Sequence, residues 1–239
     1  MLGIDIDRFL DYRLLAAPKI VSMTMTSRCN LRCVMCDHAI RNVEKEDFDP
    51  QLLDKIGDFI SRADIVDLTG LGEPTLSDLF WKILDRFEVS DAGKDEPFLM
   101  FNTNARLMPD KNIDRITRSR VRRIRVSIDA PDADTFMQIR GTPLPNVVNN
   151  AKRLVEARNA TGREFPHIGI EMTVMRRNLH QMNDMIDLAK DIGVDFVEFW
   201  SINDMSPDSL KAWTIKTNNT EFTYRDEMLG TLDQPELEA

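Results

Sequence analysis

Three cysteines, Cys29, Cys33 and Cys36, have the residue type and spacing that most clearly indicate chemistry in this sequence. They form a C-x3-C-x2-C cluster within eight residues, and the other 231 positions contain no cysteine. An odd, clustered set of cysteines is a poor disulfide framework. Thiolates gathered in this way are the ligands that soft metals and iron–sulfur clusters prefer. The cluster therefore predicts a metal or iron–sulfur site.

The number of thiolates leaves two kinds of site open. Three thiolates are one fewer than the four that usually ligate an iron–sulfur cluster, so one iron would be open to a small-molecule ligand. The alternative is a zinc site in which His38 is the fourth ligand. The other histidines, His167 and His180, are far away in the sequence and are expected to be ordinary surface or loop residues.

The chain around the cysteines alternates between strand-like and helix-like patterns. Polar N-cap residues precede two of the helix-like runs: Asp49, followed by Pro50 at the first helical position, and Asp132. Strands are expected at residues 19–26, 64–69, 97–102, 123–128, 167–174 and 196–200. Helices are expected at residues 1–15, 49–62, 77–86, 110–118, 132–139, 146–160 and 180–192.

These alternations predict an α/β fold, a partial (β/α)6 TIM-like barrel that is open on one side. Repeated β/α units give parallel strands with right-handed crossovers. A complete eight-fold barrel takes ~250 residues, whereas the sixth strand here ends near residue 200. We expect an N-terminal helix in 1–17, the barrel in 18–203 and a polar extension in 204–239. The cysteines follow the first strand, at the end of the barrel where catalytic groups lie.

Further polar motifs follow the other strands. Thr69-Gly70-Leu71-Gly72-Glu73-Pro74 comes after the second strand, where glycines let backbone approach a ligand and the acid can face a cation. Asn102 and Asn104 end the third strand. At the end of the fourth strand, Ser127 and Asp129 share one face. Their carboxylate and hydroxyl could accept from ribose, or Asp129 could cap the following turn.

The segment Thr26-Ser-Arg-Cys-Asn-Leu-Arg-Cys-Val-Met-Cys36 resembles the cluster loop of the radical S-adenosylmethionine (radical SAM) superfamily, and the resemblance covers roughly residues 18–203. It implies that the three cysteines hold a [4Fe–4S] cluster. It also implies that the amino and carboxylate groups of SAM chelate the fourth iron. Many members have an aromatic residue near the adenine before the third cysteine; Met35 stands there and gives a softer apolar contact.

The resemblance also implies contacts to SAM from the other strand ends. The glycine-rich stretch would bind the methionine ammonium, Ser127 and Asp129 would bind ribose, and Arg140 would meet the SAM carboxylate or form a structural ion pair. Asn104 would make rim hydrogen bonds or contact substrate. The residues expected to bind the cofactor are Met35, Gly70, Gly72, Glu73, Asn104, Ser127, Asp129 and Arg140.

The activity implied is reductive cleavage of SAM to a 5′-deoxyadenosyl radical that removes hydrogen from a peptide or small-metabolite substrate. An electron donor such as flavodoxin or ferredoxin would be a partner.

The sequence of the cysteine loop is similar to that of members with a SPASM or twitch extension, whose additional cysteines are absent here. An inward-facing Glu171 or Glu198 would be a substrate-site candidate; the alternative for Glu198 is a salt bridge at the open edge. The competing functions are a zinc-stapled binding module and an inactive partner subunit.

Composition narrows the function classes. A net charge of −9 and a pI near 4.9 argue against a nucleic-acid binder. Five arginines between Arg118 and Arg125 are a local exception, expected to be a solvated helix end or an anion patch.

No apolar run reaches the ~20 residues that span a bilayer, and no secretory signal is evident, so we expect a cytoplasmic protein. Residues 201–239 are expected to fold across the open side of the barrel, or to leave it to a partner or further domain.

Overall fold

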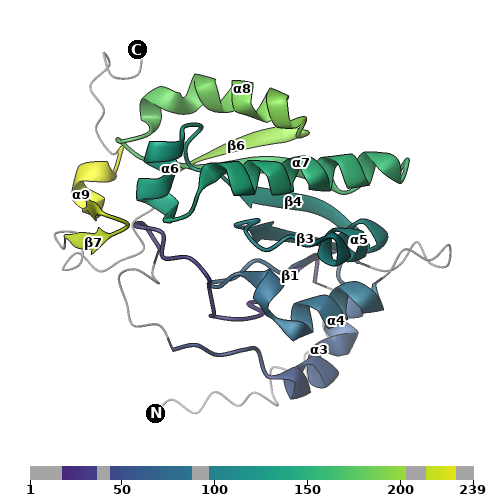
Figure 1. The fold of residues 1–239 in the computed structure, drawn as a ribbon. Helices are drawn as coiled ribbons and strands as arrows, with labels where there is room; N and C mark the ends of the chain where they lie inside the picture. The colour runs from purple at the N-terminus through teal and green to yellow at the C-terminus, as the bar shows by residue number, and fades with distance from the viewer. Residues whose placement is uncertain (1–17, 37–43, 88–96, 203–213, 230–239) are drawn as a thin grey trace, which may run out of the picture.

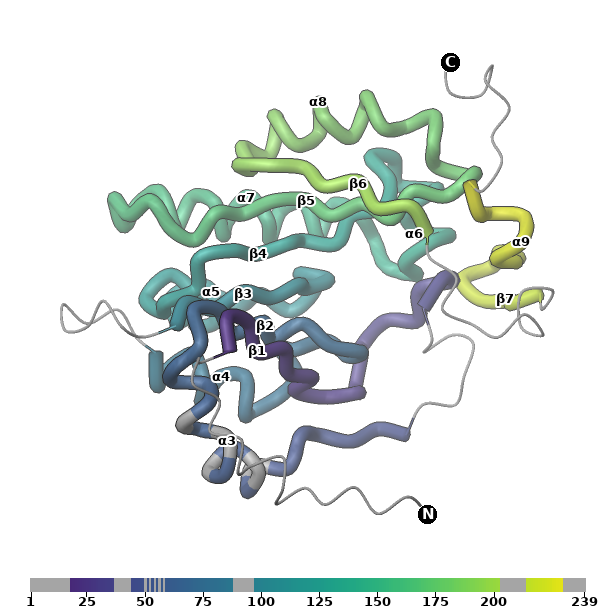
Figure 2. Tube along the Cα trace, turned by 180° about the vertical axis from the view of Figure 1, so that it is seen from behind, coloured from purple at the N-terminus to yellow at the C-terminus, as the bar shows by residue number. Residues whose placement is uncertain are grey.

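The main body of the protein is a six-stranded parallel sheet. The computed structural model describes residues 18–36, 44–87, 97–202 and 214–229. The strand order is β1-β2-β3-β4-β5-β6, so each strand pairs with the next along the chain and the sheet is open between β1 and β6 (Figures 1 and 2). The strands are β1 (Ile20–Ser22), β2 (Ile65–Asp67), β3 (Phe98–Thr103), β4 (Val121–Ser127), β5 (His167–Val174) and β6 (Phe196–Ser201). The predicted partial barrel is confirmed.

Helices follow the strands and cover the outer face of the sheet (Figure 1). Asp49 accepts from the backbone N–H of Gln51 at 2.9 Å, and Asp132 accepts from that of Thr135 at 2.9 Å, which confirms both predicted N-caps. The α-helices are α3 (Pro50–Arg62), α4 (Asp78–Arg86), α5 (Asp110–Arg118), α6 (Ala133–Arg140), α7 (Leu144–Ala160) and α8 (Met182–Ile192). Two 3-10 turns, η1 (Pro74–Leu76) and η2 (Leu179–Gln181), precede α4 and α8.

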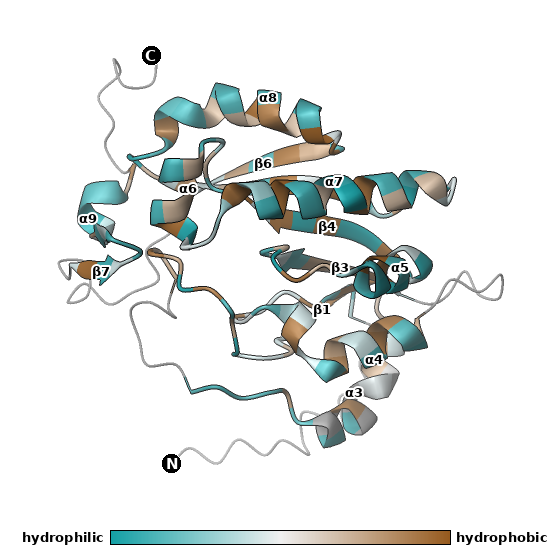
Figure 3. Ribbon diagram, viewed as in Figure 1, coloured by the Kyte–Doolittle hydropathy of each residue, from teal (hydrophilic) through white to brown (hydrophobic). Residues whose placement is uncertain are grey.

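Alternation along the strands separates the two faces of the sheet. On β3 and β4, Leu99, Phe101, Ile124 and Val126 are fully buried and face the helices, where they form the core. Figure 3 shows these helices with apolar residues on one side and polar residues on the other. The intervening strand residues face the interior of the open barrel and are mostly polar. The apolar core therefore lies between the sheet and the helices that surround it, and the barrel interior contains mostly polar side chains.

Several element boundaries differ from the sequence-based expectation by two or more residues, namely those of β1, β2, β4, α7 and α8. β1 ends at Ser22 and is much shorter than the expected strand at 19–26. Beyond Ser22 the chain pairs with another segment, because the carbonyl of Met25 accepts from the backbone N–H of Phe48 at 3.0 Å. α7 begins at Leu144, two residues before the expected start. The helix expected at 1–15 lies outside the described residues.

The chain ends, in its described part, with a small hairpin and a helical turn. β7 (Ile215–Thr217) pairs antiparallel with β8 (Thr220–Phe222), and α9 (Tyr224–Glu227) follows. This unit lies at the carboxyl end of the barrel, where it contacts the cysteine loop, α6 and the loop after β5 (Figure 1). The described part of the tail therefore packs at the carboxyl end of the barrel. The rest of the stretch 201–239 that is expected to cover the open side lies mostly outside the described residues, so that expectation stays a prediction.

Within the ranges given above, no helix has both the length and the apolar character needed to cross a bilayer.

Candidate active site

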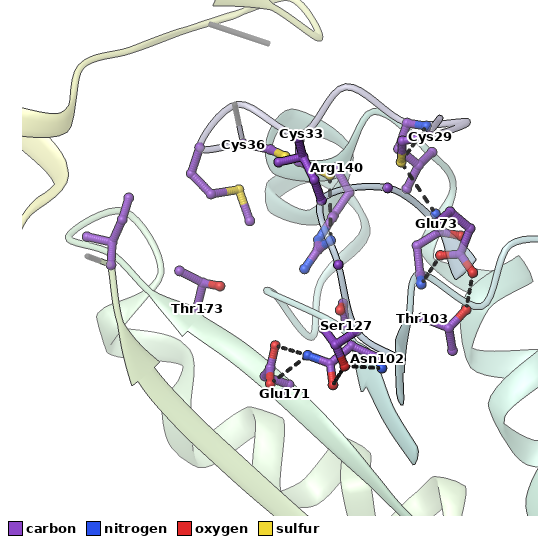
Figure 4. Close-up of a pocket in the computed structure, with 18 residues that line it drawn as sticks. Cys29, Cys33, Cys36, Glu73, Asn102, Thr103, Ser127, Arg140, Glu171 and Thr173 are labelled. Carbon is purple, nitrogen blue, oxygen red and sulfur yellow. Dashed lines mark hydrogen bonds between the residues drawn. The ribbon is translucent and has the colours of Figure 1, made fainter. Parts of the chain in front are cut away.

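A pocket of about 330 Å³ opens at the carboxyl ends of the strands (Figure 4). Its lining comes from the cysteine loop, the loop after β2, the ends of β3, β4 and β5, and the end of α6. It contains every residue that the sequence analysis assigned to the cluster or to SAM except Asp129. Those residues are Cys29, Cys33, Met35, Cys36, Gly70, Gly72, Glu73, Asn104, Ser127 and Arg140. The structure thus brings together side chains that lie more than a hundred positions apart.

The three cysteines are reduced, and polar hydrogens already point toward two of them. Cys33 is buried, whereas Cys29 and Cys36 are half-buried. The Cys29 sulfur accepts from the backbone N–H of Leu31 at 3.4 Å, and Arg140 donates to the Cys33 sulfur at 3.6 Å. The Asn104 amide lies 4.0 Å from the Cys29 sulfur. Donors placed in this way favour the thiolate form that a metal cluster requires.

Burial disfavours the thiolate form of Cys29 and Cys33 when no cluster is bound. Burial raises the pKa of Cys29, and the hydrogen bond from Leu31 offsets only part of that effect. Burial also raises the pKa of Cys33 against the opposing charge of Arg140. Loading a metal group onto these sulfurs therefore releases protons, which is the usual coupling of metal binding to thiol ionisation.

The donor set fits a group larger than a single ion. Among the described residues, no three histidine, cysteine or acidic side chains are close enough together to share one metal ion. The three cysteines nevertheless line one pocket, spread around its rim (Figure 4). A cluster that presents a separate iron to each thiolate matches this arrangement. His38, the fourth ligand of the alternative zinc site, lies outside the described residues.

The glycine-rich loop after β2 packs against the chain that leads into the cysteine loop. Gly72 donates to the carbonyl of Thr26 at 3.0 Å, and a Cβ atom at Gly72 would lie 2.4 Å from the carbonyl oxygens of Thr26 and Arg28. A Cβ atom at Gly70 would lie 2.7 Å from the Thr24 side chain. The structure thus explains both glycines by a close approach between two loops, whereas the sequence suggested an approach to a ligand.

The carboxylate of Glu73 is fully engaged inside this loop. It is buried and accepts from the hydroxyl groups of Thr75 and Thr103, both at 2.7 Å, and from the backbone of Asn104 at 2.8 Å. Burial raises the pKa of Glu73, and these hydrogen bonds offset part of that rise. Glu73 therefore ties the loop after β2 to the end of β3, and it lines the pocket as it does so.

Asp129 does not line the pocket. Its carboxylate is completely buried, where it accepts from the backbone N–H of Thr173 at 2.8 Å and forms an ion pair with Arg140. Of the two roles considered for Arg140, the structure shows the structural ion pair. Asp132 caps the helix that follows, and Asp129 instead joins β4 to β5 and to the end of α6.

Arg140 connects this buried acid to the cysteine loop. Its guanidinium group contacts the Asp129 carboxylate and the Cys33 sulfur, and its side chain is 12% exposed. Burial alone would lower the pKa of Arg140, but Asp129 and Cys33 outweigh that effect and raise the pKa. A permanent positive charge therefore lies beside Cys33.

A network of charged and polar side chains runs from the deep side of the pocket into the barrel interior. The Asn102 amide donates to both carboxylate oxygens of Glu171 at 3.0 Å (Figure 4). Arg125 donates to Asn102 at 3.3 Å. Glu198 accepts from Arg125 at 2.5 Å and pairs with Arg123. Of the two roles considered for Glu198, the structure shows the salt bridge. The sequence analysis did not connect Arg123 and Arg125 with these acids, although alternation along β4 placed both on the interior face.

Comparisons with known proteins agree with this geometry. The family model described as Radical SAM superfamily matches residues 23–199. The tungsten-containing aldehyde ferredoxin oxidoreductase cofactor-modifying protein of Pyrococcus furiosus is 26% identical over 196 residues, which are 80% of this chain and 54% of that protein. Mycofactocin maturase MftC of Mycobacterium tuberculosis is 26% identical over 180 residues, 75% of this chain and 44% of the maturase.

Solved structures show the same fold. Streptococcus suis SuiB bound to S-adenosylmethionine superposes with a TM-score of 0.64 at 17% identity, covering 84% of this chain and 44% of SuiB. The chain spans about half the length of the curated relatives that it matches. Because the family model covers most of the chain, including the cysteine loop and all the strand ends that build the pocket, the protein belongs to the radical SAM superfamily.

Proposed function

We propose that this protein holds a [4Fe–4S] cluster on Cys29, Cys33 and Cys36, and that it cleaves SAM reductively. Enzymes of the radical SAM superfamily use these two cofactors. When bound, they supply a 5′-deoxyadenosyl radical that removes a hydrogen atom from the substrate. The substrate is a peptide or a small metabolite, and a low-potential electron carrier such as flavodoxin or ferredoxin supplies the electron.

One observation carries this proposal: the three thiols line the same pocket as the strand-end motifs. A structural metal site would need only the cysteine loop. Here the loop after β2, the end of β4 and Arg140 surround the same space, and they provide polar groups beside the thiols. Such a pocket has room and hydrogen-bonding groups for a ligand next to the cluster.

Different residues of the pocket would bind the cluster and the different groups of SAM. The cysteines hold iron, and Arg140 supplies positive charge beside Cys33, where a cluster and the SAM carboxylate would both be anionic. Ser127 faces the pocket and can hydrogen-bond ribose. Asp129, which we first expected on ribose, positions Arg140 instead. Glu73, Gly70 and Gly72 shape the wall that faces the SAM amino group.

We place the substrate on the side of the pocket that faces the barrel interior. Glu171 and Thr173 line the deep side of the pocket. Glu171 has its two oxygens bound to one amide of Asn102, so each oxygen retains lone pairs for a further donor. Burial raises the pKa of Glu171, with Arg125 and Asn102 opposing the rise. We infer that a substrate hydroxyl, amide or ammonium donates to this carboxylate.

Metal analysis after anaerobic reconstitution tests the proposal. We expect about four irons and four labile sulfides per chain, with the visible absorption of an iron–sulfur cluster. One zinc and no sulfide would support the zinc-stapled binding module and overturn the proposal. A full cluster that never cleaves SAM under dithionite would identify the inactive partner subunit. A matched variant, Met35→Leu, changes a neighbouring side chain without removing a ligand and is expected to retain the iron.

A further inference from the structure

The turn of the C-terminal hairpin reaches the backbone of the cysteine loop. The side-chain amide of Asn218 donates to the carbonyl oxygen of Arg32 at 3.1 Å. That carbonyl belongs to the peptide group between Arg32 and Cys33. The same amide lies 3.4 Å from the carbonyl of Ile139, which also accepts from the loop residue Val34 at 2.9 Å. Asn218 therefore lies where the cysteine loop and the end of α6 meet.

A second contact from the same unit fixes the next cysteine. The hydroxyl group of Tyr224 donates to the carbonyl oxygen of Met35 at 2.6 Å. This carbonyl belongs to the peptide group that leads into Cys36. The two hydrogen bonds thus hold the two peptide groups that directly precede Cys33 and Cys36. Neither donor lies within residues 23–199, the part of the chain that the family model matches.

The hairpin is itself anchored to the barrel. The carboxylate of Glu227 accepts from the backbone of Arg177 at 3.0 Å and from its side chain at 2.5 Å. Arg177 also donates to the carbonyl of Glu221 at 2.8 Å. Phe222 is 1% exposed and packs edge-on against Tyr224. The loop after β5 and the core therefore hold the unit in place while its turn and its tyrosine reach the cysteine loop.

The shape of the turn places Asn218 for this contact. Asn218 and Asn219 both adopt positive φ angles, 53° and 59°, as a tight two-residue hairpin turn requires. A Cβ atom at Gly141 would lie 2.3 Å from the Asn218 side-chain oxygen, so the turn sits directly against the end of α6. Asn219 has the same backbone conformation, but its side chain is exposed.

We propose that residues 215–227 form a clamp that positions Cys33 and Cys36 as ligands, with Asn218 and Tyr224 as its positioning residues. The inference rests on the proposed function, because it concerns the same three cysteines. Cys29 lies outside the clamp, since it precedes both of the contacted peptide groups. The clamp therefore predicts that losing either contact loosens two of the three cysteines and leaves the third unchanged.

Alkylation of the metal-free full chain tests this selectivity. The variants are Asn218→Gly, which keeps the positive φ and removes the amide, and Tyr224→Phe, which keeps the ring and removes the hydroxyl. Asn219→Gly is the matched control in the same turn. Loss of one hydrogen bond is expected to raise the alkylation rates of Cys33 and Cys36 by about two- to ten-fold, as followed by mass spectrometry. The rate of Cys29 is expected to stay the same, as are all three rates in Asn219→Gly.

The reconstituted protein gives a second readout. Both clamp variants are expected to lose iron to a chelator faster than Asn219→Gly, with an unchanged melting temperature. Equal alkylation and iron-loss rates in all variants, or a uniform rise at all three cysteines, would overturn the clamp. Tyr224→Phe decides the matter if Asn218→Gly fails to fold. A wild-type chain that binds no iron–sulfur cluster would instead refute the proposed function, whatever the alkylation pattern.

Discussion

The two walls of the pocket differ in how far their polar groups are already paired. On the cysteine-loop wall, the sulfurs of Cys29 and Cys33 have only long contacts with N–H donors, at 3.4–4.0 Å. On the barrel-interior wall, Asn102, Glu171 and their neighbours form charge-assisted hydrogen bonds, several of them at 3.0 Å or shorter. The charges of the barrel-interior wall are thus paired before any ligand arrives. The sulfurs of the cysteine-loop wall, which we call the thiol wall, gain strong partners only when a metal group binds.

The largest expected effect comes from removing one of the three thiols. Replacing Cys29, Cys33 or Cys36 with alanine removes a ligand that no other described cysteine can supply. Each variant is expected to lose the intact cluster and all SAM cleavage, as measured by iron content, visible absorption and 5′-deoxyadenosine formation. A variant that retained full iron and absorption would show that the thiol wall is not the metal site.

Arg140 lies between the two walls, and removing its charge has the next largest effect. In Arg140→Gln the carboxylate of Asp129 stays completely buried without its ion-pair partner, which is expected to cost about 3–5 kcal/mol of unfolding free energy. Urea unfolding of the metal-free chain measures this. Adding Asp129→Asn is expected to recover much of the loss. A double variant as unstable as the sum of the two single variants would contradict a direct pairing.

Asp129→Ala separates positioning from iron binding. The substitution frees Arg140 from its partner while leaving all three thiols in place. Arg140 is then no longer held in place beside the pocket, so the SAM dissociation constant is expected to rise with an unchanged iron content, by less than the ~1.5–3 kcal/mol that a direct charge-assisted hydrogen bond contributes. An unchanged dissociation constant would show that Asp129 has no part in binding SAM.

Two glutamates sharpen the comparison with a smaller effect. Both carboxylate oxygens of Glu73 accept hydrogen bonds, so Glu73→Gln places an NH2 group against hydroxyl or N–H donors and leaves polar atoms unsatisfied. The expected loss is about 1–3 kcal/mol of unfolding free energy. Glu171→Gln is the matched control on the interior wall, where the carbonyl oxygen of the glutamine can still accept from the Asn102 amide. Its expected loss is below about 1 kcal/mol. Equal losses in urea unfolding would remove the distinction between the two acids.

Local signals in the sequence were enough to predict most of the fold. Asp49 and Asp132 cap their helices as expected, since capping depends on residues two or three positions away. The order of the strands followed from the β/α alternation. The cysteine loop and the strand ends met in one pocket because parallel strands bring their carboxyl ends to the same edge.

Pairings between distant segments could not be predicted in the same way. The Asp129–Arg140 ion pair depends on how α6 folds back onto β4, and the contact of Gly72 with Thr26 depends on how two loops pack. The hairpin had a local signal that was missed: Asn218 and Asn219 lie between alternating residues and favour the positive φ angles of a tight turn. The contact of that turn with the cysteine loop is a tertiary feature that no local pattern encodes.

The most direct test of the central claim is the SAM-cleavage assay on the anaerobically reconstituted chain reduced with dithionite. We predict that the wild-type protein forms 5′-deoxyadenosine and methionine from SAM, and that the three cysteine-to-alanine variants form neither. A wild-type chain that carries a complete [4Fe–4S] cluster and binds SAM, yet releases no 5′-deoxyadenosine, would contradict the account.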